Sequence, residues 1–350
     1  MKNVLLINGF EIPHYRVPVY NYLCDYLIKN NFALTVVSKG VQEGNPHTIW
    51  FENRESHLYW TKLIRLIIDT RPDVIIFWVK PTLNMWIVLY LAKLLKIKVI
   101  HWGHRRPEHP NILIKTFVLN VLEHWVDDAI ILYAEHLRKY VWNRFQSKTF
   151  VANNTLNLTI YKHLRRPRED VKAKYGIYTN KNIICMGRMQ RRKRIDDLIQ
   201  SFRMLNMEDV GLILVGPDSE GILANVNGEN IFKLGAVYAE ESLDLLSASD
   251  VYCLPGHLGL SIVDAFYCGL PVVTENVMHA PEIMYLKDGV NGFMIPKGDI
   301  NQLAAKLKTL LRDDALREKF SNAARKEIMT NGHIERMCEG FLNALQSVCK

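Results

Sequence analysis

The sequence predicts an α/β protein of two domains, each a parallel sheet covered on both faces by helices. Short apolar runs alternate with helical patterns along the whole chain, as in successive βαβ units. The runs are continuously apolar, which is typical of strands buried on both faces. The 350 residues suit two domains of ordinary size.

The first series of strands and helices is expected to form a domain over residues 1–165. Helical patterns such as 17–30 and 57–70 separate its strands. The predicted strands are 3–8, 33–38, 73–78, 98–102 and 128–133.

A polar, charged stretch at 158–180 contains Pro167 and indicates a domain boundary. The second domain is expected over 166–335, and residues 336–350 are predicted as a helix that packs back on the first domain. The expected architecture is two doubly wound domains that face each other, with a cleft at the carboxyl ends of their strands, where ligands bind in such sheets. The second series of strands is 182–187, 210–216, 250–255 and 270–274, with helices over 194–205 and 299–313.

Composition limits the classes of binding partner and the cellular compartment that are expected. The formal net charge of +8 favours anionic partners. The basic residues are spread out and no base-reading motif is present, so nucleic acid is not expected. The six cysteines have no metal-ligand spacing and are predicted to be reduced thiols of a cytoplasmic protein. The first ten residues, MKNVLLINGF, do not read as a signal peptide.

The longest apolar region, 81–102, is interrupted by Lys93, Lys96 and Lys98, which argues against a membrane span. We expect a buried helix that runs into a strand. The alternative is a helix that also touches an anionic bilayer, with its lysines at the headgroups.

The first candidate site is MGRMQRRKRIDDLI, residues 186–199. A predicted strand ends at Gly187, where glycine permits a sharp turn. Arg188 follows at once and Lys193 comes five residues later. The planar guanidinium group of the arginine and the ammonium group of the lysine could both bind phosphate oxygens. The alternative is a solvated basic turn, because further arginines crowd the same place.

The second candidate site is CLPGHLGLSIVDAFYCGLPVVT, residues 253–274. Gly259, Leu260 and Ser261 are predicted to start a helix whose free N–H groups bind an anion. Asp264 falls in the first turn or so of that helix. It either complements the helix dipole or accepts hydrogen bonds from two neighbouring hydroxyls, as a carboxylate does with a ribose.

Two further stretches follow predicted strands of the first domain. In NGFEIPHYR, 8–16, Gly9 permits close approach of a ligand, although a plain turn explains it equally. In HWGHRRPEHP, 101–110, His101, His104 and Arg105 gather at a strand end, without a metal-ligand spacing. The alternative is a group of satisfied surface residues.

Several catalytic motifs are absent. The chain contains no G-x-x-x-x-G-K-[ST], no G-x-S-x-G and no D-x-D. A P-loop, a serine hydrolase elbow and a metal-dependent sugar-transfer motif therefore lack support.

The motifs together resemble a known family. GRMQRRK, LILVG and LPGHLGLSIVDAFYCGLPVVTENVMHAPEIMYLKDGVNGFMIPKGD are similar to the retaining glycosyltransferases of family 4, which have the GT-B architecture of two facing Rossmann-like domains. The resemblance is strong over residues 180–300. It is looser in the N-terminal half, through YRVPVYNYL, HWGH, DDAIILYAEHLRKYV and VANNTLN.

The resemblance implies roles for the candidate residues. Arg188 and Lys193 would hold the donor diphosphate and act in catalysis together with His104. The donor site would also include Gly9, Gly187, Gly256, His257, the start of the helix at 259–261, and Asp264 on the nucleotide ribose. His101, His104 and Arg105 would contact the acceptor.

One departure from the family stands out. Gly256 occupies the place of the first of two glutamates, as in a branch with PG-x-x-GL and a later H-x-P-E, here His279 to Glu282. We expect Gly256 to leave room for the donor sugar. His257, Glu275 and His279 are then the nearest polar candidates to recognise it.

The implied activity is transfer of a sugar from a nucleotide-diphosphate sugar to a saccharide or lipid-linked acceptor in bacterial surface polysaccharide synthesis. Neither a metal nor any cofactor beyond the donor is expected. The location would be the cytoplasm, at the inner face of the cell membrane. Two alternatives stay open: a GT-B nucleotide-sugar epimerase, and a catalytically inactive nucleotide-sugar-binding partner.

Overall fold

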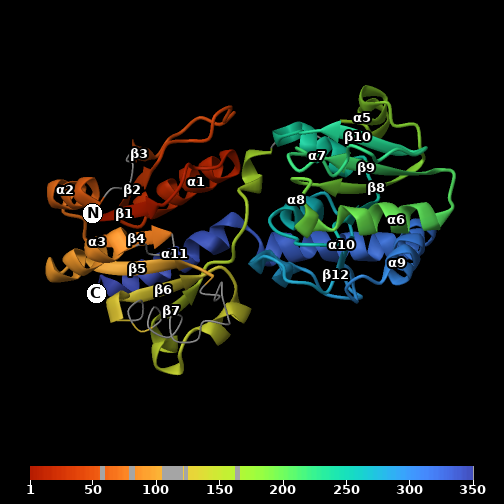
Figure 1. The fold of residues 1–350 in the computed structure, drawn as a ribbon. Helices are drawn as coiled ribbons and strands as arrows, with labels where there is room; N and C mark the ends of the chain where they lie inside the picture. Colours follow the sequence, from red (N-terminus) through yellow and green to blue (C-terminus); the bar gives the residue numbers. More distant parts are fainter. Residues whose placement is uncertain (56–59, 79–82, 105–120, 122–124, 162–165, 350) are drawn as a thin grey trace. The chain divides into compact units, whose positions relative to one another are not determined.

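A computed structural model describes the chain except for residues 56–59, 79–82, 105–120, 122–124, 162–165 and 350 (Figure 1). The chain divides into two compact units, and each is described by itself. The N-terminal unit comprises Met1–Asn157 and His333–Lys350, and the C-terminal unit comprises Leu158–Gly332. The sequence predicts these boundaries at 165/166 and 335/336.

The N-terminal unit is built on a seven-stranded parallel sheet in the order β3-β2-β1-β4-β5-β6-β7. Its central strands are continuously apolar and buried, as the sequence predicts. The strands are β1 (Lys2–Asn8), β2 (Phe32–Ser38), β3 (Glu52–Glu55), β4 (Val74–Trp78), β5 (Lys98–Gly103), β6 (Ala129–Leu132) and β7 (Thr149–Val151). The α-helices are α1 (Val17–Ile28), α2 (Trp60–Thr70), α3 (Leu83–Leu94) and α11 (Ile334–Val348).

The last helix, α11, packs on α1, β6 and β7. Gly340 makes this approach possible, because a Cβ there would lie 2.3 Å from the Val151 carbonyl oxygen. The Phe341 ring then lies 4.9 Å from the Trp102 ring, centroid to centroid. The end of the chain therefore belongs to the core of the N-terminal unit.

The register of the N-terminal sheet aligns the carboxyl ends of its strands. Asn8 pairs with Trp78, and Phe77 pairs with His101 on the next strand. The segments after β1, β4 and β5 therefore leave the sheet at one edge, which is where ligands bind in parallel α/β sheets.

The C-terminal unit has a six-stranded parallel sheet in the order β10-β9-β8-β11-β12-β13. The strands are β8 (Lys181–Met186), β9 (Val210–Val215), β10 (Ile231–Gly235), β11 (Val251–Cys253), β12 (Val272–Glu275) and β13 (Gly292–Ile295). The α-helices are α5 (Arg168–Tyr175), α6 (Ile195–Leu205), α7 (Ala239–Ser247), α8 (Ser261–Tyr267), α9 (Ile300–Arg312) and α10 (Asp314–Asn331).

The apolar region at 81–102 forms α3 followed by β5, as predicted. None of the helices in the described part of the chain combines the length and apolar character needed to cross a bilayer. Lys93 of α3 and Lys98 of β5 both pair with the Asp128 carboxylate, at 2.9 and 3.7 Å. The alternative, that this region also touches an anionic bilayer, stays a prediction.

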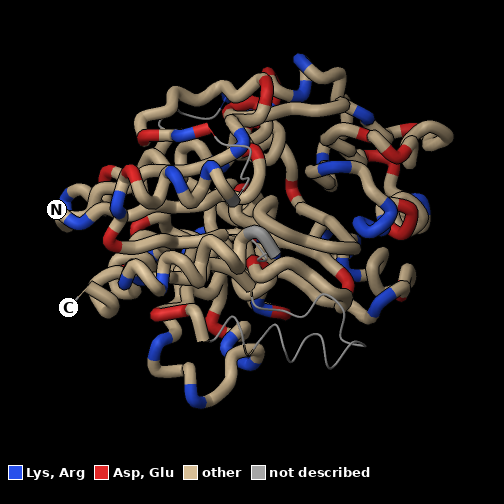
Figure 2. The backbone as a smooth tube through the Cα atoms, turned by 60° about the vertical axis from the view of Figure 1, so that its left-hand side comes forward, with Lys and Arg blue, Asp and Glu red and all other residues tan. Residues whose placement is uncertain are grey.

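Lys and Arg are interspersed with Asp and Glu along the backbone (Figure 2).

Candidate functional site

The candidate site of the C-terminal unit begins where β8 leaves the sheet. Gly187 has a φ of 134°, and its N–H donates to the Val215 carbonyl at 2.9 Å. A Cβ on the neighbouring Gly216 would lie 2.0 Å from the Gly187 carbonyl oxygen. Both positions require glycine, so that the ends of β8 and β9 can turn out of the sheet in direct contact.

The turn after Gly187 buries a lysine. Lys193 is the last residue of the 3₁₀ turn η5 (Arg191–Lys193) and is 9% exposed. A Cβ on Gly187 would lie 3.8 Å from its Nζ, so the ammonium group lies against the end of β8. Burial is the main cause of the lowered pKa of Lys193, which is about 8, and the neighbouring Arg192 and Arg188 contribute to this decrease.

Lys193 has no counter-charge within the described residues, where no carboxylate contributes to its pKa and no ion pair involves its ammonium. Arg188 is exposed and lies close enough to Lys193 to lower the pKa of its ammonium group. A buried cation is stable only when it is paired. A buried lysine beside a second cation therefore indicates an anionic ligand.

The loop after β11 is hydrogen-bonded to this turn. The Gly256 N–H donates to the Lys193 carbonyl at 2.8 Å, and the His257 N–H donates to the Arg192 carbonyl at 3.0 Å. A Cβ on Gly256 would lie 2.2 Å from the Arg192 carbonyl oxygen and 2.4 Å from the Lys193 carbonyl carbon.

Gly256 is therefore required by the packing of two loops. The backbone of residues 192–193 fills the space in which we expected the donor sugar, and the Gly256 N–H is already bonded. The expectation that Gly256 leaves room for the sugar is corrected accordingly.

Two of the polar residues expected near the sugar brace the loop. His279 is buried; its Nδ1 accepts from the Leu258 N–H at 3.1 Å and its Nε2–H donates to the Glu275 carbonyl at 2.7 Å. The Glu275 carboxylate pairs with Arg194 Nε at 2.7 Å and accepts from the Gly298 N–H at 2.9 Å. Burial raises the pKa of Glu275. His257 is half-buried, with its Nδ1 2.9 Å from the Met278 carbonyl oxygen.

The start of α8 presents backbone donors beside the buried lysine. Within the described part of the chain, the N–H groups of Gly259, Leu260 and Ser261 have no hydrogen-bond acceptor. Tyr252 Oη lies 2.7 Å from Ser261 Oγ and 2.9 Å from the Met186 carbonyl oxygen. This link joins the start of α8 to the end of β8, so that the two predicted motifs form one site.

Asp264 is half-buried on α8, one turn after the first residue of the helix. It lies close enough to Tyr252 to add to the rise in the pKa of that hydroxyl, of which burial is the main cause. The carboxylate is therefore in the same site as the helix start, and its assignment to a ribose stays a prediction.

The residues predicted in the N-terminal unit lie at the carboxyl edge of its sheet but differ in exposure. Gly9 follows β1, where the Asn8 side chain donates to the Phe10 carbonyl at 2.7 Å and shapes the turn. His101 is buried edge-on against Phe77, with ring centroids 4.5 Å apart. His104 is half-buried directly after β5.

Arg105 lies outside the described residues. A residue that the sequence analysis did not select, Arg16, is buried at the same edge. The stretch NGFEIPHYR contains it, but nothing in the sequence alone indicates that this arginine is buried.

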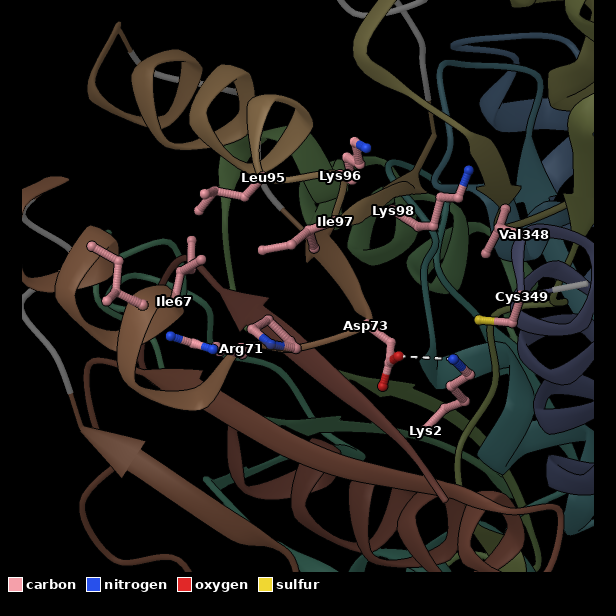
Figure 3. Close-up of a pocket in the computed structure, with 12 residues that line it drawn as sticks. Lys2, Ile67, Arg71, Asp73, Leu95, Lys96, Ile97, Lys98, Val348 and Cys349 are labelled. Carbon is pink, nitrogen blue, oxygen red and sulfur yellow. Dashed lines mark hydrogen bonds and ion pairs between the residues drawn. The ribbon is translucent and has the colours of Figure 1, made fainter.

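A cavity of about 600 Å³ lies at the opposite edge of the N-terminal sheet, where β1 and β5 begin (Figure 3). Lys2 and Asp73 pair across it at 2.9 Å, and Lys96 and Lys98 stand at its rim. None of the predicted site residues lines this cavity. Among the described residues, no group of three His, Cys, Asp or Glu side chains is arranged to hold a metal ion.

Comparison with known proteins supports the fold and the likeness of the C-terminal unit to glycosyl transferases. Residues 167–327 match the family described as glycosyl transferases group 1. The chain is 32% identical over 158 residues to the phosphatidyl-myo-inositol mannosyltransferase of Mycobacterium leprae, which covers 42% of each chain. It is 25% identical over 235 residues to the capsular polysaccharide biosynthesis glycosyltransferase CapM of Staphylococcus aureus, which covers 61% of each chain. The chain thus spans less than two thirds of the length of these relatives.

Solved structures extend the likeness to the whole chain. Anabaena Alr3699/HepE in complex with UDP-glucose has a TM-score of 0.76 at 16% identity and covers 99% of this chain and 100% of that chain. A putative UDP-N-acetylglucosamine 2-epimerase from Listeria monocytogenes has a TM-score of 0.70 at 15% identity and covers 99% of this chain and 96% of that one. These likenesses and the two parallel sheets confirm the predicted GT-B fold of two Rossmann-like units. At these identities they show the fold alone.

Proposed function

We propose that the protein is a glycosyltransferase whose C-terminal unit binds a nucleotide-diphosphate sugar. The observation that carries this proposal is Lys193, which is buried without a counter-charge beside Arg188 and the free N–H groups at the start of α8. A diphosphate supplies the negative charge that this group of donors lacks. The match of residues 167–327 to group 1 glycosyl transferases supports the same assignment.

The chemistry follows from the charge that develops on the leaving group. When the bond between the anomeric carbon and the diphosphate oxygen breaks, the electron pair stays on the phosphate. Lys193 and Arg188 stabilise that charge more strongly in the transition state than in the bound donor. Asp264 accepts hydrogen bonds from the ribose hydroxyls and holds the nucleotide in register.

The transferase retains the configuration of the sugar and needs no metal ion. The acceptor hydroxyl forms its new bond on the face that the diphosphate leaves, and its proton passes to the departing phosphate oxygen. The acceptor is a saccharide or a lipid-linked saccharide of a bacterial surface polysaccharide, bound at the carboxyl edge of the N-terminal sheet near Gly9 and His104. The name of the capsular relative in Staphylococcus aureus supports this acceptor class.

The protein works in the cytoplasm at the inner face of the membrane. Because Lys93 and Lys98 both pair with Asp128, contact with anionic lipid falls to Lys96 and to the exposed side chains of Leu94 and Leu95. Cations beside exposed apolar groups suit the headgroup region of a bilayer.

The experiment is a donor screen with and without saccharide acceptors. Purified protein is incubated with UDP-, GDP- and TDP-sugars, and release of nucleoside diphosphate is measured. We expect release from one donor to rise when an acceptor is added, and Lys193→Met to abolish it. The matched control is Lys181→Met, because Lys181 stands at the other end of β8 and pairs with Asp314 at 2.7 Å. Full activity of Lys193→Met would overturn the proposal.

A nucleotide-sugar epimerase is the second candidate, because the Listeria structure shares the fold. In the same screen an epimerase would convert the donor sugar without any acceptor. It would form no new glycoside and would show no matching release of nucleoside diphosphate. A catalytically inactive binding partner would bind the donor and turn over none.

A further inference from the structure

Arg16 is a buried cation that the proposed chemistry does not use. It ends the 3₁₀ turn η1 (His14–Arg16), immediately before α1, and is 2% exposed. Three aromatic rings surround its guanidinium group: the Cζ atom lies 5.4 Å from the ring centroid of Trp102 and 5.8 Å from those of Trp78 and Tyr15.

The guanidinium group is only partly hydrogen-bonded. Nη2 donates to the Asn154 side-chain oxygen at 2.6 Å. Nε and Nη1 are buried and have no acceptor in the described part of the chain, and no carboxylate there pairs with Arg16. Contacts with aromatic faces offset part of the cost of burying the charge, but a buried guanidinium with unsatisfied donors remains unfavourable.

The position of Arg16 is that of a ligand site. Trp78 ends β4 and pairs in register with Asn8, the last residue of β1. Asn154 follows β7, and its N–H donates to the Tyr133 carbonyl just after β6. Arg16 therefore lies over the carboxyl ends of the N-terminal strands.

A second unsatisfied donor lies in the same group of side chains. Trp102 Nε1 is buried and has no acceptor among the described residues. The unsatisfied atoms of this pair, Arg16 and Trp102, are all donors, so the missing partner is an acceptor of hydrogen bonds. Tyr15 is 38% exposed and Trp78 is half-buried, so these are the outermost rings that an incoming group would pass.

We propose that Arg16 binds an oxyanion carried by the acceptor, so that the substrate class is an acidic or phosphorylated saccharide. The shared chemistry is a carboxylate or phosphate whose oxygens accept from Nε and Nη1. This inference rests on the proposed function, in which the N-terminal unit binds the acceptor. It adds that the acceptor must carry a negative charge.

The test is a binding titration that needs no turnover. The protein is first saturated with UDP, which occupies the diphosphate site of the C-terminal unit, and tryptophan fluorescence is then followed. The probes are glucuronate, glucose 1-phosphate and, as the neutral control, glucose. Trp78 and Trp102 lie beside Arg16 and serve as the reporters.

We expect one of the two anionic probes to bind about ten- to hundredfold more tightly than glucose, the range for a hydrogen bond to a charged group. The tighter probe tells whether the acceptor carries a carboxylate or a phosphate. Equal binding of all three probes would overturn the inference, and this comparison needs no variant.

Two variants locate the site. Arg16→Met is expected to lose the preference for the anionic probe, and Arg16→Lys to keep part of it. The matched control is Arg138→Met, because Arg138 is a half-buried arginine of the same unit that pairs with Glu135 at 2.6 Å. A folded Arg16→Met protein with an unchanged preference would assign Arg16 a purely structural role.

UDP binding separates the two proposals. If the protein binds the anionic probe through Arg16 but binds no nucleoside diphosphate, the anion site at Arg16 stands and the proposed function is refuted. If the protein binds UDP through Lys193 but shows no preference for anionic probes, the proposed function stands and the inference about Arg16 is refuted.

Discussion

Replacing Gly256 by alanine tests the packing of the two loops that build the donor site. A Cβ there would lie 2.2 Å from the Arg192 carbonyl oxygen, and the neighbouring contacts are also backbone atoms, which cannot rotate away. The turn that carries Lys193 must therefore move, and the hydrogen bond from the Gly256 N–H to the Lys193 carbonyl is strained or lost.

The magnitude follows from two contributions. Forcing an extra methyl group into close-packed atoms costs about 1–3 kcal/mol. Loss of the hydrogen bond adds about 1 kcal/mol. We expect Gly256→Ala to lower the free energy of unfolding by about 2–4 kcal/mol and to weaken nucleoside diphosphate binding as well, because Lys193 is displaced.

Gly259→Ala is the matched control for this prediction. Its Cβ would lie 3.6 Å from the nearest side-chain atom, Ala280 Cβ, which is an ordinary van der Waals distance. The assays are urea unfolding and calorimetric titration with UDP and GDP. Wild-type stability and affinity in Gly256→Ala would refute the packing argument. A Gly256→Glu protein that folds with wild-type stability and changes only its choice of donor sugar would refute it too.

Five further predictions concern the same two units. The pKa of Lys193 is lowered to about 8, mainly by burial, so the lysine loses its charge above pH 8. The affinity for nucleoside diphosphate should then fall by up to about tenfold per pH unit. Calorimetry between pH 6.5 and 9.5 should show this fall in the wild type and not in Lys193→Met. In the unfolded chain Lys193 keeps its proton up to its ordinary pKa of 10.5, whereas in the folded, ligand-free protein it loses the proton near pH 8. The free energy of unfolding should therefore rise as the pH increases through 8, and urea unfolding at each pH measures it. Asp264→Ala should weaken binding of the bare nucleotide and of the whole donor equally; unchanged binding of both would leave it a partner of the helix dipole. Transfer should survive EDTA, and complete loss restored by Mg²⁺ or Mn²⁺ would reveal a metal site. Sedimentation with anionic vesicles should weaken in high salt and in Lys96→Ala, whereas indifference to vesicles at low salt would exclude the membrane contact.

The central strands could be predicted from the sequence because their apolar runs are continuous, as in β1 and β9. The strand β3 (Glu52–Glu55) could not, since it is polar and exposed at the edge of the sheet. The same holds for β10 (Ile231–Gly235), whose burial is partial along its length. Edge strands of this kind carry little of the hydrophobic pattern that identifies a strand.

The turn after Gly187 and the start of α8 could be placed from the sequence because local residues determine where a strand ends and a helix begins. Contacts between distant parts of the chain changed the interpretation of other residues. Gly256 is confined by residues 192–193, and His279 braces the loop at Leu258. The burial of Arg16 likewise depends on Trp102 and Asn154, far along the chain.

The most direct measurement of the central claim is a thermodynamic cycle on Lys193. Calorimetry gives the affinities of uridine and UDP, and of guanosine and GDP, for the wild-type protein and for Lys193→Met. If Lys193 is the counter-charge of the diphosphate, the diphosphate form of one nucleoside should bind far more tightly than the bare nucleoside in the wild type, and Lys193→Met should lose about 2–5 kcal/mol of that difference. The same advantage of diphosphate over nucleoside in both proteins would contradict the account.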